Sequence, residues 1–348
     1  MPSLSPQTIR ALRAEKPTLR ERDFAEQHNI SEAQLIAAFT PKSATRIASH
    51  PDQIIGAAQQ LGEVMALTRT ASCVHEKVGA YDDYHAGEHA SMVLNEDIDL
   101  RIFPKHWCHA FAVEKETDKG LQRSLQVFDA AGDAVHKIFM RATSNDAAWA
   151  GVKEQLAHSD QSETLLVDPR QPVEAAKSNP DKTEILRTEW AKLTDTHQFL
   201  RLCSKLKMNR LGAYRSAGQP FVRQLRTTGV NDMLLAVQEA GIEIMVFVGN
   251  KGCIQIHNGP IETLREMGPW QNVMDPRFNL HLRLDHIAEV WAVEKPTQRG
   301  PAISIEAFDK DGALILQTFG LGKKGRDYRA HWGQIVASMP ALEAEAMA

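Results

Sequence analysis

The sequence Asp195-Thr196-His197-Gln198-Phe199 places an imidazole at the start of an amphipathic stretch. Asp195 or Thr196 can cap a helix here, which would put His197 in the first turn and turn Phe199 toward the core. A neutral imidazole can ligate a metal, including the iron of haem. The alternative is an ordinary surface histidine beside a helix cap, and the motif by itself leaves both interpretations open.

A second histidine pattern, His85-Ala86-Gly87-Glu88-His89, has the spacing of the H-x-x-E-H zinc-protease motif. That motif needs a helix to place both histidines on one face. Gly87 disfavours a helix, and no third ligand is evident in the sequence. We therefore interpret this segment as an exposed polar loop rather than a zinc site.

The segment Gly320-Leu321-Gly322-Lys323-Lys324-Gly325 is rich in glycine and lysine. The segment is not a phosphate-binding Walker loop, because Lys323 is not followed by Ser or Thr. It can be a basic loop that contacts carboxylates or phosphates, or a plain solvated turn.

The chain contains an internal duplication. Residues 100–139 align without a gap on residues 280–319, and 13 of these 40 pairs are identical. The sequence Ala-Val-Glu-Lys, for example, ends at both Lys115 and Lys295. Repeats of this kind indicate two copies of one structural unit. A residue that occurs in only one copy is therefore a better functional candidate than a shared one.

Two of the strand positions that differ between the copies carry side chains that could contact a ligand. Arg101 is replaced by His281, and Phe103 by Arg283. Because these side chains occur in only one copy, they are functional candidates.

The histidine of the Asp-Thr-His segment is also specific to one copy. When Phe24 is aligned with Phe199, His197 lies opposite Arg22. The shared pair Lys115 and Lys295 instead favours a structural or solvated role.

The elements that must position these residues follow from periodicity. Residues 5–40 and 183–206 have helical spacing, with Ser31 as an N-cap. Glu63 to Arg69 reads as a strand, and residues 100–140 and 280–319 read as antiparallel hairpins closed by the turns DAAGD and DKDG. Each copy is thus predicted to be α+β, with a large, mainly antiparallel sheet and flanking helices.

The predicted boundaries place the first repeat at residues 1–155, a linker at 156–182 and the second repeat at 183–348. The linker contains VDPRQPVEAAKSNPDK, whose prolines and charged residues are typical of a connecting segment. A length of 348 residues suits two domains of ordinary size.

Composition narrows the class of protein. The net charge of −4 argues against a general nucleic-acid binder. The sequence contains no run of about 18 apolar residues, so it predicts no membrane span. The polar N-terminus lacks the apolar core of a secretory signal. The four cysteines are not in C-x-x-C spacing, so we expect reduced thiols and a cytoplasmic location.

Several long phrases resemble one family. GAYDDYHAGEHASMVLNEDIDLRIF, DTHQF, MVFVGNKGCIQIHNGP and HIAEVWAVEKPT are similar to the cytoplasmic haem-utilisation proteins of Gram-negative bacteria, the HemS/ChuS/PhuS/HmuS group. The similarity extends over essentially the whole chain, including the duplication. It implies two similar domains and a haem cleft formed mainly by the second copy.

The resemblance also assigns roles to residues. It implies that His197 is the axial ligand of the haem iron and that Arg101 lies on the distal side, a tentative catalytic position, followed by Phe103. The remaining positions that match the family's pocket in the second copy are Arg210, Phe247, Lys295 and Gln317, with Phe319 where many members have tyrosine. The family's rim arginine is also absent near Gly322, and Lys323 or Lys324 is expected to replace it.

The family implies a cytoplasmic protein that binds imported haem in iron acquisition. Some members degrade the haem ring with an external electron donor, and others carry haem to a separate haem oxygenase. The sequence leaves both functions open, and it leaves open whether His75 binds a second haem. The expected partners are haem itself, an inner-membrane haem importer or a haem oxygenase.

Overall fold

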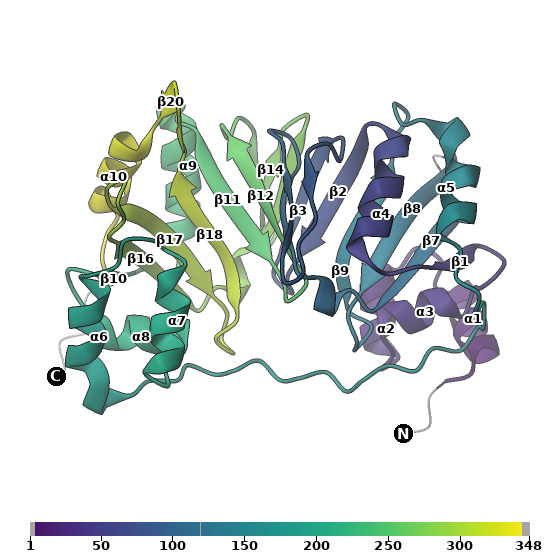
Figure 1. Ribbon diagram of the computed structural model, residues 1–348, viewed down its shortest axis with the longest axis horizontal. Helices are drawn as coiled ribbons and strands as arrows, with labels where there is room; N and C mark the ends of the chain where they lie inside the picture. The colour runs from purple at the N-terminus through teal and green to yellow at the C-terminus, as the bar shows by residue number, and fades with distance from the viewer. Residues whose placement is uncertain (1–3, 119, 343–348) are drawn as a thin grey trace. The chain divides into compact units, whose positions relative to one another are not determined.

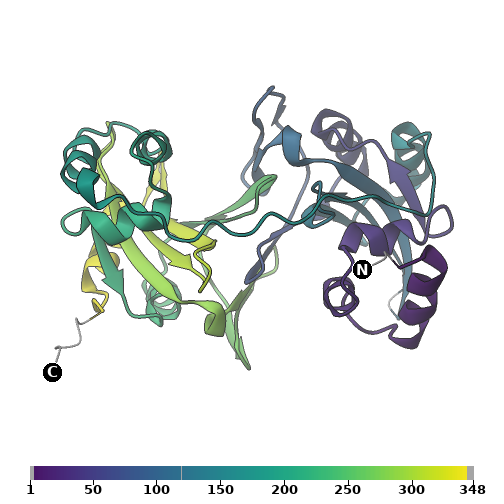
Figure 2. The ribbon, with the colours of Figure 1, turned by 90° about the horizontal axis from the view of Figure 1, so that it is seen from below.

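The computed structural model describes residues 4–118 and 120–342. They form two compact units. Unit 1 contains residues 1–69, 75–171 and 249–255, and unit 2 contains residues 70–74, 172–248 and 256–348. Residues 158–179 connect the copies without a regular helix or strand (Figures 1 and 2).

The helices of the first copy are α1 (Pro6–Glu15), α2 (Glu21–Gln27), α3 (Glu32–Ala37), α4 (Pro51–Ala58) and α5 (Trp149–Leu156). Its strands are β1 (Ala44–Ile47), β2 (Val64–Arg69), β3 (Cys73–Gly79), β4 (Tyr84–His85), β5 (Ser91–Leu94), β6 (Asp99–Ile102), β7 (His109–Thr117), β8 (Gly120–Phe128) and β9 (Ala134–Met140).

The second copy contains the helices α6 (Thr183–Trp190), α7 (Gln198–Lys205), α8 (Arg210–Ala217), α9 (Gly229–Ala240) and α10 (Arg329–Ser338). Its strands are β10 (Val222–Leu225), β11 (Ile244–Gly249), β12 (Cys253–Gly259), β13 (Leu264–Met267), β14 (Trp270–Met274), β15 (Phe278–Arg283), β16 (Glu289–Lys295), β17 (Ala302–Phe308), β18 (Leu314–Gly320), β19 (Gly322–Lys323) and β20 (Arg326–Asp327).

The two copies share one strand order. Unit 1 contains the antiparallel run β1-β7-β8-β9-β2, and unit 2 contains the equivalent run β10-β16-β17-β18-β11. Both runs carry a register shift at the same place, at Val127/Phe128 and at Ala307/Phe308. The predicted α+β class and the duplication are confirmed, and the predicted turns after Phe128 and Phe308 join the antiparallel pairs β8–β9 and β17–β18.

The Phe-Asp-x-x-Gly sequence that both hairpins share forms its turn through local interactions. The carboxylate of Asp129 accepts hydrogen bonds from the amides of Ala131 and Asp133, at 2.9 and 3.0 Å. Gly132 in that turn has a φ of +77°, a conformation that favours glycine. Asp309 and Gly312 repeat the arrangement.

Two predictions about element boundaries were wrong. Residues 100–115 do not form one strand, because a 3-10 turn at Pro104–His106 separates β6 from β7. An equivalent turn at Leu284–His286 lacks proline, so the interruption belongs to the shared fold and not to Pro104. His197 is the N-cap of α7 rather than a residue of its first turn.

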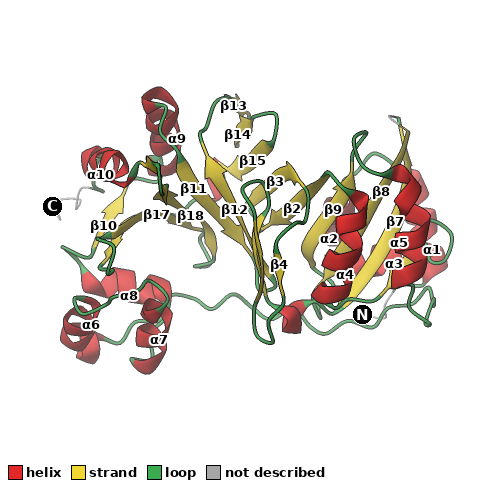
Figure 3. Ribbon diagram, turned by 45° about the horizontal axis from the view of Figure 1, so that its top comes forward, coloured by secondary structure: helices red, strands yellow, loops and turns green. Residues whose placement is uncertain are grey.

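In unit 2, the helices α6, α7 and α8 pack together on one face of the sheet, as Figure 3 shows. Their core includes Trp190, Phe199 and Tyr214 from the helices and Trp291 and Phe308 from the strands. The opposite face packs on α9 and α10. In the part of the chain that the structure describes, no helix is long and apolar enough to cross a membrane.

Candidate functional site

His197 presents its imidazole to solvent, since 94% of the side chain is exposed. The carboxylate of Asp195 accepts from the His197 backbone amide and from Nδ1, both at 2.7 Å. These hydrogen bonds lower the pKa of Asp195, so the carboxylate is an acceptor only. Nδ1 therefore carries a proton, and in the neutral imidazole the lone pair lies on the solvent-facing Nε2, as a metal ligand requires.

Arg210 and Lys295 meet at a buried carboxylate. Arg210 donates to Glu306 Oε2 at 2.8 Å, and Lys295 donates to Glu306 Oε1 at 3.1 Å. The Glu306 side chain is fully buried, and Lys295 also donates to the hydroxyl of Tyr214 at 3.0 Å. We call Tyr214, Arg210, Lys295 and Glu306 the buried charge cluster.

The buried charge cluster changes the pKa values of Glu306 and Lys295. Burial by itself would raise the pKa of Glu306, but the charges of Lys295 and Arg210 outweigh it and hold the pKa well below its usual range. Burial lowers the pKa of Lys295, and Glu306 opposes this shift. Two cations share one carboxylate, so the cluster has one excess positive charge.

Phe247, Gln317 and Phe319 lie on the same sheet face as Glu306. Gln317 is the cross-strand partner of Glu306 on one side and of Phe247 on the other. The rings of Phe247 and Phe319 contact each other with centroids 5.3 Å apart. All three side chains are half-buried, so an apolar surface next to the buried charge cluster stays accessible.

Arg101 and Phe103 belong to unit 1. Arg101, on β6, pairs with Asp99 and also donates to the carbonyl of Leu100 at 3.0 Å. Phe103 follows β6, and its amide donates to Gly252. Unit 2 therefore brings together Arg210 with Lys295, and Phe247 with Gln317 and Phe319, while Arg101 and Phe103 are placed only within unit 1.

The remaining candidates from the sequence lie in a hairpin, in a loop and in the protein interior. Lys323 lies in the two-stranded β19–β20 hairpin, and the HAGEH segment continues from β4 into a loop. Among the described residues, no group of three or more His, Cys, Asp or Glu side chains could hold a metal ion. His75 is fully buried, which does not suit an exposed ligand position.

Three residues of the site, Glu306, Tyr214 and Asp195, are not among the site residues predicted from the sequence. Glu306 could have been identified from the duplication, because its partner in the first copy is Gln126. Asp195 was considered only as a helix cap, although an acidic residue two positions before a histidine can also orient the imidazole.

Comparison with known proteins places the chain in a family. The family model described as the haemin-degrading HemS.ChuX domain matches residues 29–156 and 207–339. The "Hemin transport protein HmuS" of Yersinia pestis is 35% identical over 338 residues, which are 97% of this chain and 97% of that protein.

Two solved structures agree over nearly the whole chain. Holo-PhuS, a heme-binding protein from Pseudomonas aeruginosa, is 41% identical with a TM-score of 0.91, covering 97% of this chain and 100% of that one. ChuS, an E. coli heme oxygenase, is 32% identical with a TM-score of 0.86, covering 95% and 99%. Since the family model and these relatives match most of its length, the chain belongs to the HemS/ChuX family.

Proposed function

We propose that this protein binds haem on unit 2 and ligates the iron through Nε2 of His197. The observation that carries the proposal is the exposed imidazole whose Nδ1 is held 2.7 Å from Asp195. A carboxylate partner of this kind fixes the ring and raises the basicity of the ligating nitrogen. Family membership and the heme-binding description of PhuS support the same ligand.

The other residues of unit 2 fit the chemistry of haem. Haem is a large apolar plate with two carboxylates, and it needs apolar walls and cations. The half-buried Phe247 and Phe319 supply apolar surface. The buried charge cluster supplies one excess positive charge for a propionate, and Lys323 and Lys324 are proposed as further cations at the rim.

Arg101 is proposed as the donor on the distal side of the haem. Its guanidinium stays charged and can donate to a bound ligand or water. The proposal depends on its match to the family's L-R-I-F strand and on its replacement by His281 in the second copy. Phe103 is proposed as its apolar neighbour.

Bound haem has two proposed fates. Family relatives are described as a hemin transport protein and as a heme oxygenase. In the first case the protein delivers haem from an inner-membrane importer to a separate oxygenase. In the second it opens the ring with electrons from an external donor, and the iron supplies the chemistry when haem is bound. We propose a cytoplasmic location for either role.

A haem titration tests the binding proposal. Wild-type protein should bind about one haem, and His197→Ala should bind more weakly with a shifted Soret band. His85 is a matched control, because it is half-exposed and its ring pairs with Asp83 at 2.9 Å in unit 1. If His197→Ala and His85→Ala both match the wild type, the ligand assignment is wrong. Bleaching of the Soret band with reductant in air would identify degradation, and a persistent band would identify a carrier.

A further inference from the structure

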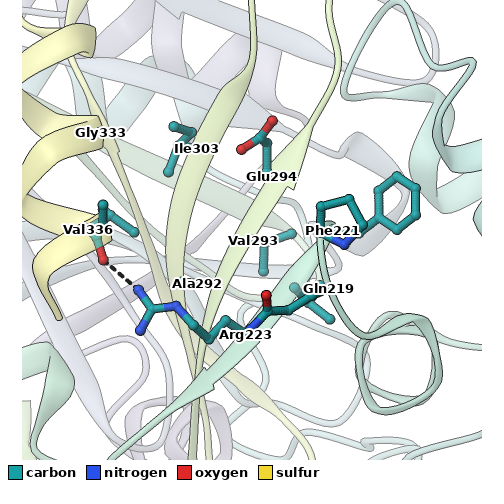
Figure 4. Close-up of a pocket in the computed structure, with 12 residues that line it drawn as sticks. Gln219, Phe221, Arg223, Ala292, Val293, Glu294, Ile303, Gly333 and Val336 are labelled. Carbon is teal, nitrogen blue, oxygen red and sulfur yellow. Dashed lines mark hydrogen bonds between the residues drawn. The ribbon is translucent and has the colours of Figure 1, made fainter. Parts of the chain in front are cut away.

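A cavity of about 240 Å³ opens in unit 2 beside α10 (Figure 4). The strands β10, β16 and β17 form one side, with Val222, Glu294 and Ile303, and α10 contributes Gly333 and Val336. A water molecule's share of the liquid is about 30 Å³, so the cavity has room for several non-hydrogen atoms.

In the first copy, side chains of the same chain pair with the carboxylate that is equivalent to Glu294. Glu114 is the repeat partner of Glu294. Its carboxylate accepts from Lys153 Nζ at 2.7 Å and from Trp149 Nε1 at 3.0 Å, and it lies 3.6 Å from the guanidinium of Arg123. Two cations of the same chain therefore neutralise this carboxylate.

The second copy lacks both cations. Ile303 is the repeat partner of Arg123. Aligning Trp332 with Trp149 also pairs buried Ile335 of α10 with buried Val152 of α5, and it places Val336 opposite Lys153. Ile303 and Val336 both line the cavity. The indole of Trp332 donates to the carbonyl of Ile303 at 2.9 Å and not to Glu294.

The nearby guanidinium of Arg223 has other partners. It donates to the carbonyls of Met339 and Val336 at the C-terminal end of α10, as Figure 4 shows for Val336. Cations are favoured at that end of a helix. Within the described part of the chain, the structure gives Glu294 no salt bridge, and its side chain is exposed.

We propose that this cavity binds a primary alkylammonium group, with the ammonium on Glu294 and the aliphatic stem against Ile303 and Val336. The bound ligand would supply the ammonium group that, in the first copy, comes from the side chain of Lys153. Ammonium–carboxylate hydrogen bonds are stronger than neutral ones, and aliphatic stems pack on apolar side chains while the charged end stays wet. The site is independent of haem binding.

Titration with n-butylamine, followed by NMR of the haem-free full-length protein, tests the proposal. Wild type should show saturable shifts at the cavity residues, whereas n-butanol should not bind. Glu294→Gln should weaken binding at least tenfold. Val336→Lys should do the same by restoring the internal cation, and Glu114→Gln is the matched control that should leave binding unchanged.

A second arm uses Nα-acetyl-lysine amide to distinguish the source of the ammonium group. Tighter binding of this compound than of n-butylamine would identify a lysine side chain as the occupant, and the reverse would identify a free amine. Absence of saturable binding by either compound, or equal binding to wild type and Glu294→Gln, would overturn the proposal.

Discussion

Lys295 donates to Glu306 at 3.1 Å, and both side chains are buried. Their repeat partners differ: Lys115 is partly exposed and pairs with Glu21, and Gln126 replaces the carboxylate. One shared lysine is thus a solvated residue in the first copy and a member of the buried charge cluster in the second. Sequence identity between repeats does not imply identical surroundings.

Replacing Glu306 with Gln, the residue of the first copy, should destabilise unit 2. The change leaves Arg210 and Lys295 without their shared carboxylate, and an uncompensated buried charge costs about 3–5 kcal/mol. Urea unfolding at pH 7 measures the loss. Glu189→Gln, at the exposed ion pair of Glu189 with Lys192 in the same unit, should cost far less because surface ion pairs contribute little to stability, and equal losses would argue against the cluster's special role.

Lys295→Met should accelerate haem dissociation, because it reduces the excess charge of the buried charge cluster from one to zero. We expect a loss of about 1–3 kcal/mol, or roughly ten- to a hundredfold in affinity. Stopped-flow transfer of haem to an excess of a scavenger protein gives the rate. Lys115→Met should have little effect, and matching rates for the two variants would contradict the assignment of the propionate site to unit 2.

Asp195→Asn should weaken haem binding without removing the iron ligand. Loss of a carboxylate partner of a metal-bound histidine typically costs ten- to a hundredfold in affinity. Haem titration measures this, and Asp83→Asn, beside the control residue His85, should change nothing. An unchanged affinity in Asp195→Asn would show that the 2.7 Å contact has no part in ligation.

Acid should destabilise unit 1 through His136. Burial lowers the pKa of this histidine from 6.5 to about 3, and its ring contacts Tyr81 at 2.5 Å and Thr68 at 2.8 Å. Below pH 6.5 this histidine takes up a proton in the unfolded chain but not in the folded chain. Its contribution to the free energy of unfolding is therefore fully present above pH 6.5 and is lost progressively as the pH falls toward 3. The expected loss from this group is about 2 kcal/mol between pH 6.5 and 5.

His136→Leu introduces the residue of the second copy, Leu316. It should remove this pH dependence, and it should cost about 1–3 kcal/mol at pH 7 because the hydroxyls of Tyr81 and Thr68 lose a partner. Urea unfolding at pH 7 and pH 5 gives both quantities. An unchanged slope with pH would mean that His136 is not the titrating group.

The fold could be predicted from the sequence because its signals are local. The Asp129 and Asp309 turns and the alternating strands are encoded within a few residues of each other. The buried charge cluster could not be predicted in this way, since Arg210 and Glu306 are 96 positions apart and meet only when α8 packs on β17. The outward lone pair of His197 likewise depends on the exact start of α7, which sequence periodicity does not define.

The absorption spectrum of the His197→Ala haem complex, recorded with and without added imidazole, tests the central claim most directly. If Nε2 of His197 ligates the iron, the variant's Soret band should differ from that of the wild type, and free imidazole should restore the wild-type position by filling the vacated place. A His197→Ala complex whose spectrum already matches the wild type, with no response to imidazole, would contradict the account.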